Sequence, residues 1–263
     1  MSSTFAEDTL PPDLARSLAG GRSLRVDAWD ASSRQGVTRS VNEDAFGERD
    51  RRAFVVADGM GGRPGGAIAA TAAVATLLDA LAVPGRAIDW RAVVEAANDA
   101  LRRAAAEAGH ARVGAAVAAL RVAGGRATVV HLGDVRAYRL GADGAVQLTT
   151  DHNVGQELTR AHLDPARLRL RPAELAALTV FLGDPGSVNG FGVRNVSVSP
   201  GDRLVLCSDG VHARLGPDVW QSVSAMSSPR QIAETLTEAA VAAGSTDDAT
   251  ALVARFADSE RPR

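Results

Sequence analysis

The feature that most constrains this chain is a set of acidic side chains placed next to apolar, strand-like runs. Asp58 directly follows the run Ala53–Ala57, and Asp209 follows the run that ends at Cys207. Carboxylates in such places lie at the rim of the core, where several like charges are costly unless cations neutralise them. Five segments share this arrangement: Asn42-Glu43-Asp44, Asp58-Gly59-Met60-Gly61-Gly62, Gly133-Asp134, Ser208-Asp209-Gly210 and Thr246-Asp247-Asp248.

The residue types favour a hard divalent cation as the neutralising partner. Mg²⁺ and Mn²⁺ prefer oxygen ligands, and the chain has no Cys/His pair with the spacing of a zinc site. For any single segment, a simple Asp-Gly turn remains the more common explanation. Five such segments in order, each beside a strand, favour metal binding.

Composition limits the possible classes of protein. The 263 residues include 29 basic and 31 acidic side chains, and the net charge of −2 argues against nucleic-acid binding. One cysteine excludes an intramolecular disulfide and suits a reducing cytosol. No apolar run approaches the roughly 20 residues of a membrane span, and the N-terminus lacks a signal-peptide pattern. We expect a cytoplasmic protein without a membrane segment.

Apolar periodicity predicts an α+β protein, because helices are inserted between runs of antiparallel strands. Strands are predicted at Leu24–Trp29, Ala53–Ala57, Val113–Val122, Ala127–Leu132, Val135–Leu140, Ala145–Leu148, Val193–Val198, Arg203–Cys207 and Thr250–Phe256. Helices are predicted at Ala67–Leu81, Trp90–Glu107 and Gln231–Ala243. We expect one folded domain over residues 23–257, with a flexible lead-in at 1–22 and a short tail at 258–263.

In their order along the chain, the acidic segments resemble the motifs of the type 2C metal-dependent serine/threonine protein phosphatases, bacterial type. The matching segments are Arg39-Ser-Val-Asn42-Glu43-Asp44, Val56-Ala-Asp58-Gly59-Met60-Gly61-Gly62, Gly133-Asp134-Val135-Arg136-Ala-Tyr138-Arg139, Leu148-Thr-Thr-Asp151-His152, Leu206-Cys-Ser208-Asp209-Gly210 and Gly244-Ser-Thr-Asp247-Asp248-Ala-Thr250. The resemblance implies a four-layer α-β-β-α sandwich, in which helices flank two central antiparallel sheets.

The resemblance also implies a site for two Mg²⁺ or Mn²⁺ ions. Asp58 would bridge the ions, Asp209 and Asp247 would complete the shell of one, and Glu43 with the Gly59 carbonyl would serve the other. A water between the ions would attack phosphorus directly, without a covalent enzyme intermediate.

Further roles follow from the same resemblance. Asp134 and Asp209 would hold the third ion that bacterial members often carry, while Asp44 and Asp248 would lie just outside the metal ligands. Arg39 would bind the substrate phosphate, because a guanidinium group matches phosphate oxygens. Arg39 and Asp58 are therefore the expected catalytic residues.

Several nearby residues have a supporting interpretation. We expect Cys207 to be a small buried hydrophobe, Arg136 to pair with a nearby acid, and Asp151-His152 to support the site as a turn. Met60 stands where some family members have histidine, so no general acid can be assigned. The expected flap, Val154–Gly190, carries four arginines that could receive phosphopeptides or simply face solvent.

Three departures from the family pattern concern the surroundings of the metal ligands. Val135 replaces a serine, Ala115-Ala116 replaces a threonine pair, and Asp248 replaces an asparagine beside Asp247. None removes an expected ligand of the two central ions.

The sequence therefore predicts a phosphatase that acts on phosphoserine and phosphothreonine in proteins and opposes a bacterial protein kinase, as a monomer. One alternative is a pseudophosphatase that serves as a regulatory binding module. Another is a phosphatase specialised for a partner-switching regulator, which would use the same chemistry.

Overall fold

The computed structural model describes residues 24–61, 64–85, 87–184 and 186–259. The lead-in expected at residues 1–22 lies outside the described residues, as do Gly62 of the second acidic segment and residues 260–263 of the expected tail. Asp258, where that tail was expected to begin, is instead the last residue of a strand.

The chain forms two five-stranded sheets in which all neighbouring strands are antiparallel. Sheet I has the order β1 (Leu24–Arg34), β10 (Ala249–Asp258), β9 (Arg203–Cys207), β6 (Arg136–Gly141) and β7 (Gly144–Gln147). Sheet II has the order β2 (Asp44–Arg49), β3 (Ala53–Met60), β4 (Gly114–Ala123), β5 (Arg126–Leu132) and β8 (Gly192–Val196).

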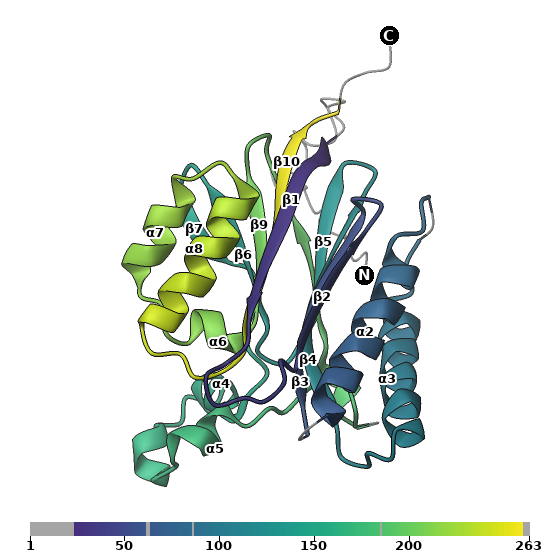
Figure 1. The fold of residues 1–263 in the computed structure, drawn as a ribbon, viewed down its shortest axis with the longest axis vertical. Coiled ribbons are helices and arrows are strands. Elements are labelled where there is room, and N and C mark those ends of the chain that lie inside the picture. The colour runs from purple at the N-terminus through teal and green to yellow at the C-terminus, as the bar shows by residue number, and fades with distance from the viewer. Residues whose placement is uncertain (1–23, 62–63, 86, 185, 260–263) are drawn as a thin grey trace, which may run out of the picture.

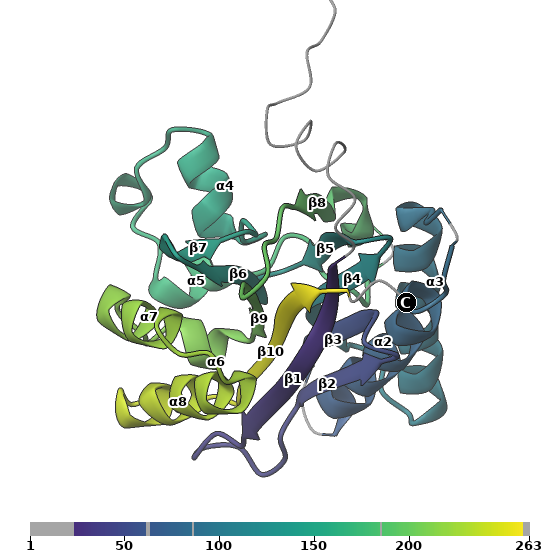
Figure 2. The ribbon, with the colours of Figure 1, turned by 90° about the horizontal axis from the view of Figure 1, so that it is seen from above.

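Helices cover the outer face of each sheet (Figure 1). Sheet II is covered by α2 (Gly65–Leu81) and α3 (Trp90–Glu107), and sheet I by α6 (Asp209–His212), α7 (Pro217–Ser224) and α8 (Pro229–Ala242). The expected flap contains α4 (Val154–Arg160), α5 (Pro172–Ala176) and the short 3₁₀ helices Pro165–Leu168 and Ser187–Gly190. Seen from above, α2 and α3 lie on one side of the two sheets, and α7 and α8 lie on the opposite side (Figure 2). The predicted α-β-β-α sandwich is confirmed.

Strand alternation divides the apolar side chains among three cores. In β3, Val55 and Ala57 pack against α2 and α3, whereas Phe54 and Val56 face the other sheet. Trp29 from sheet I meets Phe54 edge-on, with ring centroids 6.2 Å apart. Because both faces of β3 are buried, its sequence is continuously apolar, as the strand prediction assumed.

The elements that the sequence analysis missed include strand β2 and helices α6 and α7. Strand β2, with the sequence Asp-Ala-Phe-Gly-Glu-Arg, is an edge strand in which four residues are half-buried and two are exposed, so it lacks a clear alternation of buried and exposed residues. Helix α7 has only 8 residues and starts with a proline at its first turn. The first strand is also longer than predicted, because it continues to Arg34 along β10.

The antiparallel order brings the acidic segments to one end of the sandwich. Strands β3, β5 and β9 end there, and β2 and β10, which run against them, begin there. This end lies near α4 and α6 at the bottom of Figure 1.

None of the helices within the described ranges combines the length and apolarity that a membrane span requires.

Candidate active site

A cavity of about 350 Å³ opens where the acidic segments meet. Its lining residues come from both sheets and from the flap: Arg39, Glu43, Asp58, Gly59, Met60, Gly61, Ala116, Asp134, Ala176, Leu178, Asp209 and Asp247. The structure thus brings together all six metal-ligand candidates and Arg39. Asp44 and Asp248, expected just outside the ligands, are not among the lining residues.

Asp58 lies at the centre of this carboxylate group. Its cross-strand neighbour is Asp44, so two like charges stand directly opposite each other on β3 and β2. Burial, followed by repulsion from Asp44 and Asp209, raises the pKa of the Asp58 carboxyl well above 3.8. Two charged carboxylates in such a place are unfavourable without a compensating cation.

The neighbouring carboxyl groups show the same effect. Burial raises the pKa of Asp44 to about 7 despite a stabilising hydrogen bond from Ser208. Burial and repulsion from Asp209 likewise raise the pKa of Asp134 to about 7. The pKa of Asp209 is also raised, chiefly by burial and then by Asp247. Strongly shifted carboxyl groups gathered in one cleft are typical of functional sites.

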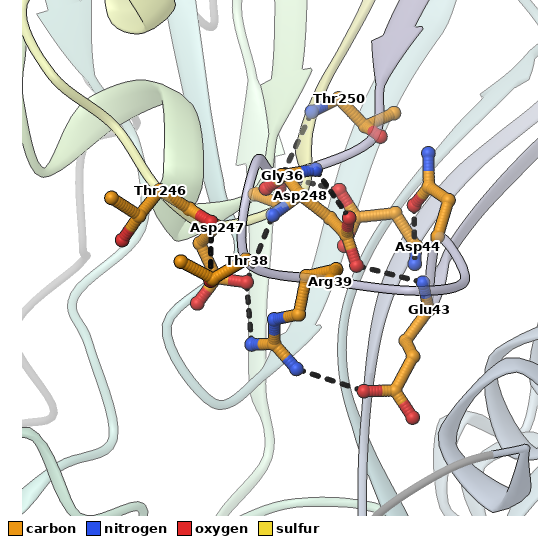
Figure 3. Close-up of polar contacts among 11 residues, drawn as sticks. Gly36, Thr38, Arg39, Glu43, Asp44, Thr246, Asp247, Asp248 and Thr250 are labelled. Carbon is orange, nitrogen blue, oxygen red and sulfur yellow. Dashed lines mark hydrogen bonds and ion pairs between the residues drawn. The ribbon is translucent and has the colours of Figure 1, made fainter.

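Arg39 is the cation that the chain itself provides at the rim (Figure 3). Its Nη1 lies 2.8 Å from Glu43 Oε2, and its Nη2 lies 2.5 Å from Asp247 Oδ1. Burial lowers the pKa of this guanidinium, but Asp247, Asp248 and Glu43 raise it by more. The side chain joins Glu43, in the loop before β2, to Asp247, in the loop before β10.

The chemistry of the remaining oxygens fits a hard divalent cation. Glu43 Oε1, Asp44 Oδ1 and Asp209 Oδ1 are buried without a hydrogen-bond partner among the described residues. No three acidic, histidine or cysteine side chains in the described ranges already form a compact ligand set. Arg39 is instead ion-paired with both Glu43 and Asp247. The oxygen donors that line the cavity suit Mg²⁺ or Mn²⁺.

Two glycines leave the room that Glu43 needs. A Cβ at Gly66 would lie 2.5 Å from Glu43 Oε1 and 2.9 Å from the Gly59 carbonyl oxygen. A Cβ at Gly59 would lie 2.7 Å from the Glu43 carbonyl oxygen, which accepts a hydrogen bond from Gly59 N at 3.2 Å. Gly59 was predicted as a site residue, whereas Gly66 was missed although it stands in a conspicuous Gly-Gly pair.

Histidines hold the turn that carries Asp134. The Gly133 N–H donates to His152 Nδ1 at 3.3 Å, and the His152 N–H donates to the Gly133 carbonyl at 2.9 Å. His212 Nε2 lies 2.8 Å from the Asp134 carbonyl oxygen. Burial lowers the pKa of His152 and His212 to about 4, so both rings are neutral near pH 7. The supporting role expected of the Asp151-His152 pair agrees with these contacts.

Arg136 forms a two-pronged ion pair beside this turn. Its Nε and Nη2 donate to the two Asp151 oxygens at 2.8 and 2.7 Å. The prediction that Arg136 pairs with a nearby acid is confirmed.

Cys207 is fully buried, as predicted, and burial raises the pKa of its thiol.

Ser208 is a residue beside the site whose contacts the sequence analysis overlooked. Its hydroxyl donates to Asp44 Oδ2 at 2.7 Å and accepts from Thr250 N at 3.0 Å. Ser208 stands inside a matched motif, but only the fold reveals that it joins β9 to β2 and β10.

Acidic residues of the flap neutralise much of the positive charge that its four arginines carry. Arg160, Arg167 and Arg171 are paired with acidic residues within the flap, at 2.9, 3.8 and 3.2 Å. Leu178 and Ala176 are the flap residues that line the cavity.

A second cavity, of about 490 Å³, lies where the α2–α3 connection meets β4, β5 and β8, and Arg121, Arg126 and Trp90 are among its lining residues. The described residues around it include no acidic side chain, in contrast to the smaller cavity.

Comparisons with known proteins identify the family of this chain. The protein phosphatase 2C family model matches residues 34–252. The serine/threonine protein phosphatase PstP of Mycobacterium tuberculosis is 28% identical over 235 residues, covering 88% of this chain and 45% of PstP. The chain thus spans less than half the length of PstP. Protein phosphatase PhpP of Streptococcus pneumoniae is 28% identical over 228 residues, covering 82% of this chain and 92% of PhpP.

Solved structures are similar over most of the chain. The catalytic domain of PstP in complex with two manganese ions superposes with a TM-score of 0.76 and 28% identity, covering 90% of this chain and 100% of that domain. The phosphatase MsPP of Mycobacterium smegmatis, in complex with cacodylate, gives a TM-score of 0.72 and 30% identity, covering 88% of this chain and 99% of MsPP.

Proposed function

The chain belongs to the protein phosphatase 2C family, and we propose that it is a metal-dependent serine/threonine protein phosphatase. The observation that carries this proposal is the group of buried carboxyl groups with raised pKa at the meeting point of the two sheets, with Arg39 at its rim. Buried carboxyl groups that lie this close together can all be ionised only when bound cations neutralise their charge.

The expected ligands are assigned to two ions as the family pattern indicates. Asp58 would hold both ions, Asp209 and Asp247 would serve one, and Glu43 with the Gly59 carbonyl would serve the other. Mg²⁺ or Mn²⁺ held by these residues would supply positive charge to the phosphoryl oxygens and lower the pKa of a bound water. The proposal is supported by the orphaned oxygens of Glu43 and Asp209.

Asp134 is proposed as a ligand of a third ion together with Asp209. Support comes from the position of Asp134 on the cavity wall and from the repulsion between the two carboxyl groups. Asp44 is not among the cavity-lining residues, and its Oδ2 accepts from Ser208, which suits a group that orients water around the ions.

Arg39 is proposed to bind the substrate phosphate. Its guanidinium is at the rim with about a third of the side chain exposed, and it already donates to two carboxylates there. Two oxygens of a phosphate group can accept from the guanidinium fork as a carboxylate does, so they can replace Glu43 and Asp247 as partners.

The residues around the cavity argue against a cysteine-based mechanism. The Cys207 thiol is fully buried, and its raised pKa keeps it protonated. No histidine is among the described residues that line the cavity. The chain therefore offers no side-chain nucleophile of that kind, which suits direct attack by water.

We also infer phosphoprotein substrates of a bacterial serine/threonine kinase, a monomer, and a cytoplasmic location. Phosphoprotein substrates are supported by the names of PstP and PhpP. The cytoplasmic location is supported by a single cysteine, which suits a reducing compartment.

The test is hydrolysis of a phosphothreonine peptide with Mn²⁺ or with EDTA. Wild type and the exposed control Asp99→Ala should be active with Mn²⁺ only. Asp58→Ala and Asp247→Ala should lose about a hundredfold or more, the scale of removing an electrostatic stabiliser. A wild type inert with every divalent ion would favour a pseudophosphatase, and activity surviving Asp58→Ala would contradict the assignment.

A further inference from the structure

Asp248 makes contacts that differ from those of a metal ligand. The side chain is only 3% exposed. Its Oδ1 accepts a hydrogen bond from Gly36 N at 2.8 Å, and its Oδ2 accepts one from Glu43 N at 2.8 Å. Both carboxylate oxygens are therefore directed at backbone amides more than 200 positions away in the chain, as Figure 3 shows.

The two amides are the ends of one loop, residues 36–43, which joins β1 to β2. This loop carries Arg39 and Glu43, the two site residues that come from it. Further contacts tie the loop to the segment before β10. The Thr38 hydroxyl donates to the Thr246 carbonyl at 3.1 Å, and a Cβ at Gly36 would lie 2.6 Å from the Asp247 carbonyl carbon.

The pattern of donors requires an acidic side chain. Two N–H groups approach the end of this side chain from the loop, so each terminal atom must be an acceptor. A carboxylate has two acceptor oxygens, whereas an asparagine has one oxygen and one NH₂ donor. The family's usual asparagine would direct its NH₂ at one of the amides and leave that buried amide without its partner.

We propose that Asp248 is a positioning residue whose two oxygens hold both ends of the 36–43 loop and so place Arg39 and Glu43 relative to Asp247. The chain neighbour of Asp248 is Asp247, whose Oδ1 accepts from both Arg39 and the Asp248 N–H. The segment Asp247-Asp248 thus provides a metal-ligand candidate, Asp247. Through the loop, it also fixes the positions of Arg39 and Glu43 opposite that candidate. This inference rests on the proposed function only for the roles of Arg39 and Glu43.

The experiment compares wild type, Asp248→Asn and a matched control, Asp202→Asn. Asp202 is also a buried aspartate that accepts from a loop amide, Ser199 N at 2.8 Å, but it does not line the cavity. Backbone amide exchange is measured by NMR in EDTA, and Mn²⁺ affinity by calorimetry. In wild type the Gly36 and Glu43 amides should exchange slowly although they lie in a loop.

In Asp248→Asn, the exchange of at least one of these amides should accelerate about tenfold or more, the scale of losing a hydrogen bond to a charged group. The Mn²⁺ dissociation constant and the KM for a phosphopeptide should rise roughly tenfold, as for other groups that orient metal ligands. The kcat at saturating Mn²⁺ and peptide should change less than about twofold. The control should keep the Mn²⁺ affinity and KM of wild type, whatever its stability.

Fast exchange of both amides in wild type would overturn the proposal, even if the variant failed to fold. Unchanged Mn²⁺ affinity and amide exchange in a folded Asp248→Asn would overturn it as well. If wild type proved to be no phosphatase, the exchange and calorimetry would still decide whether Asp248 positions the loop. A failure of the proposed function is therefore distinguishable from a failure of this inference.

Discussion

Replacing Asp134 with asparagine should stabilise the protein in EDTA, and should do so chiefly at high pH. Burial, followed by repulsion from Asp209 and Asp151, raises the pKa of the Asp134 carboxyl from 3.8 to about 7. The unfolded chain releases this proton near pH 3.8, whereas the folded chain holds it until about pH 7. The wild type therefore loses stability as the pH rises through this window. An asparagine carries no charge and avoids the loss.

The expected size follows from the shift. One pKa unit corresponds to about 1.36 kcal/mol, so the full effect is about 4 kcal/mol in the free energy of unfolding above pH 7. Roughly 3 kcal/mol of it should develop between about pH 5 and pH 8, because most of the titration lies there. The free energy of unfolding decreases as the pH rises, because the pKa of Asp134 is higher in the folded chain than in the unfolded chain.

The assay is urea unfolding of wild type and Asp134→Asn in EDTA at several pH values from 5 to 8. The exposed Asp99→Asn controls for the substitution itself. The stability difference between Asp134→Asn and wild type should grow with pH. An Asp134→Asn variant no more stable than wild type at pH 8, or a difference independent of pH, would refute the reasoning.

Three further outcomes are expected. Ser208→Ala removes the hydroxyl that joins Asp44 to β10 and should cost about 1–3 kcal/mol in urea unfolding; an unchanged stability would contradict this. Gly66→Ala should weaken Mn²⁺ binding in calorimetry because its Cβ meets Glu43 Oε1, whereas Gly216→Ala, with no atom within 4 Å of its Cβ, should not. Mn²⁺ binding should release more protons at pH 6 than at pH 8, because carboxyl groups with a pKa of about 7 must ionise to bind. Calorimetry in buffers of different ionisation enthalpy measures this release, and a pH-independent value would contradict it.

The layered fold was accessible from sequence because most strands have two buried faces or a clear alternation. Strand β3 is an example, since Phe54 and Val55 face different cores and are both apolar. Strand β2 could not be found in this way, because an edge strand needs little apolar surface. Its position depends on pairing with β3, which is a tertiary contact.

The ligand candidates could be predicted because each one marks the end of a strand, and antiparallel strands bring these ends together. Their partners could not. The contact between Gly36 and Asp248 spans 212 positions, and the one between Ser208 and Asp44 spans 164. No local pattern encodes such pairs. The ion pairs of Arg39 also arise only when the loop before β2 meets the segment before β10.

The central claim is that the acidic strand ends bind cations between the two sheets. The most direct test is anomalous X-ray scattering from crystals of this protein grown with Mn²⁺. We expect at least two Mn²⁺ peaks within the cavity lined by Glu43, Asp58, Asp209 and Asp247, and their loss in Asp58→Asn. The absence of Mn²⁺ from this cavity at saturating concentration, or peaks that persist in Asp58→Asn, would contradict the claim.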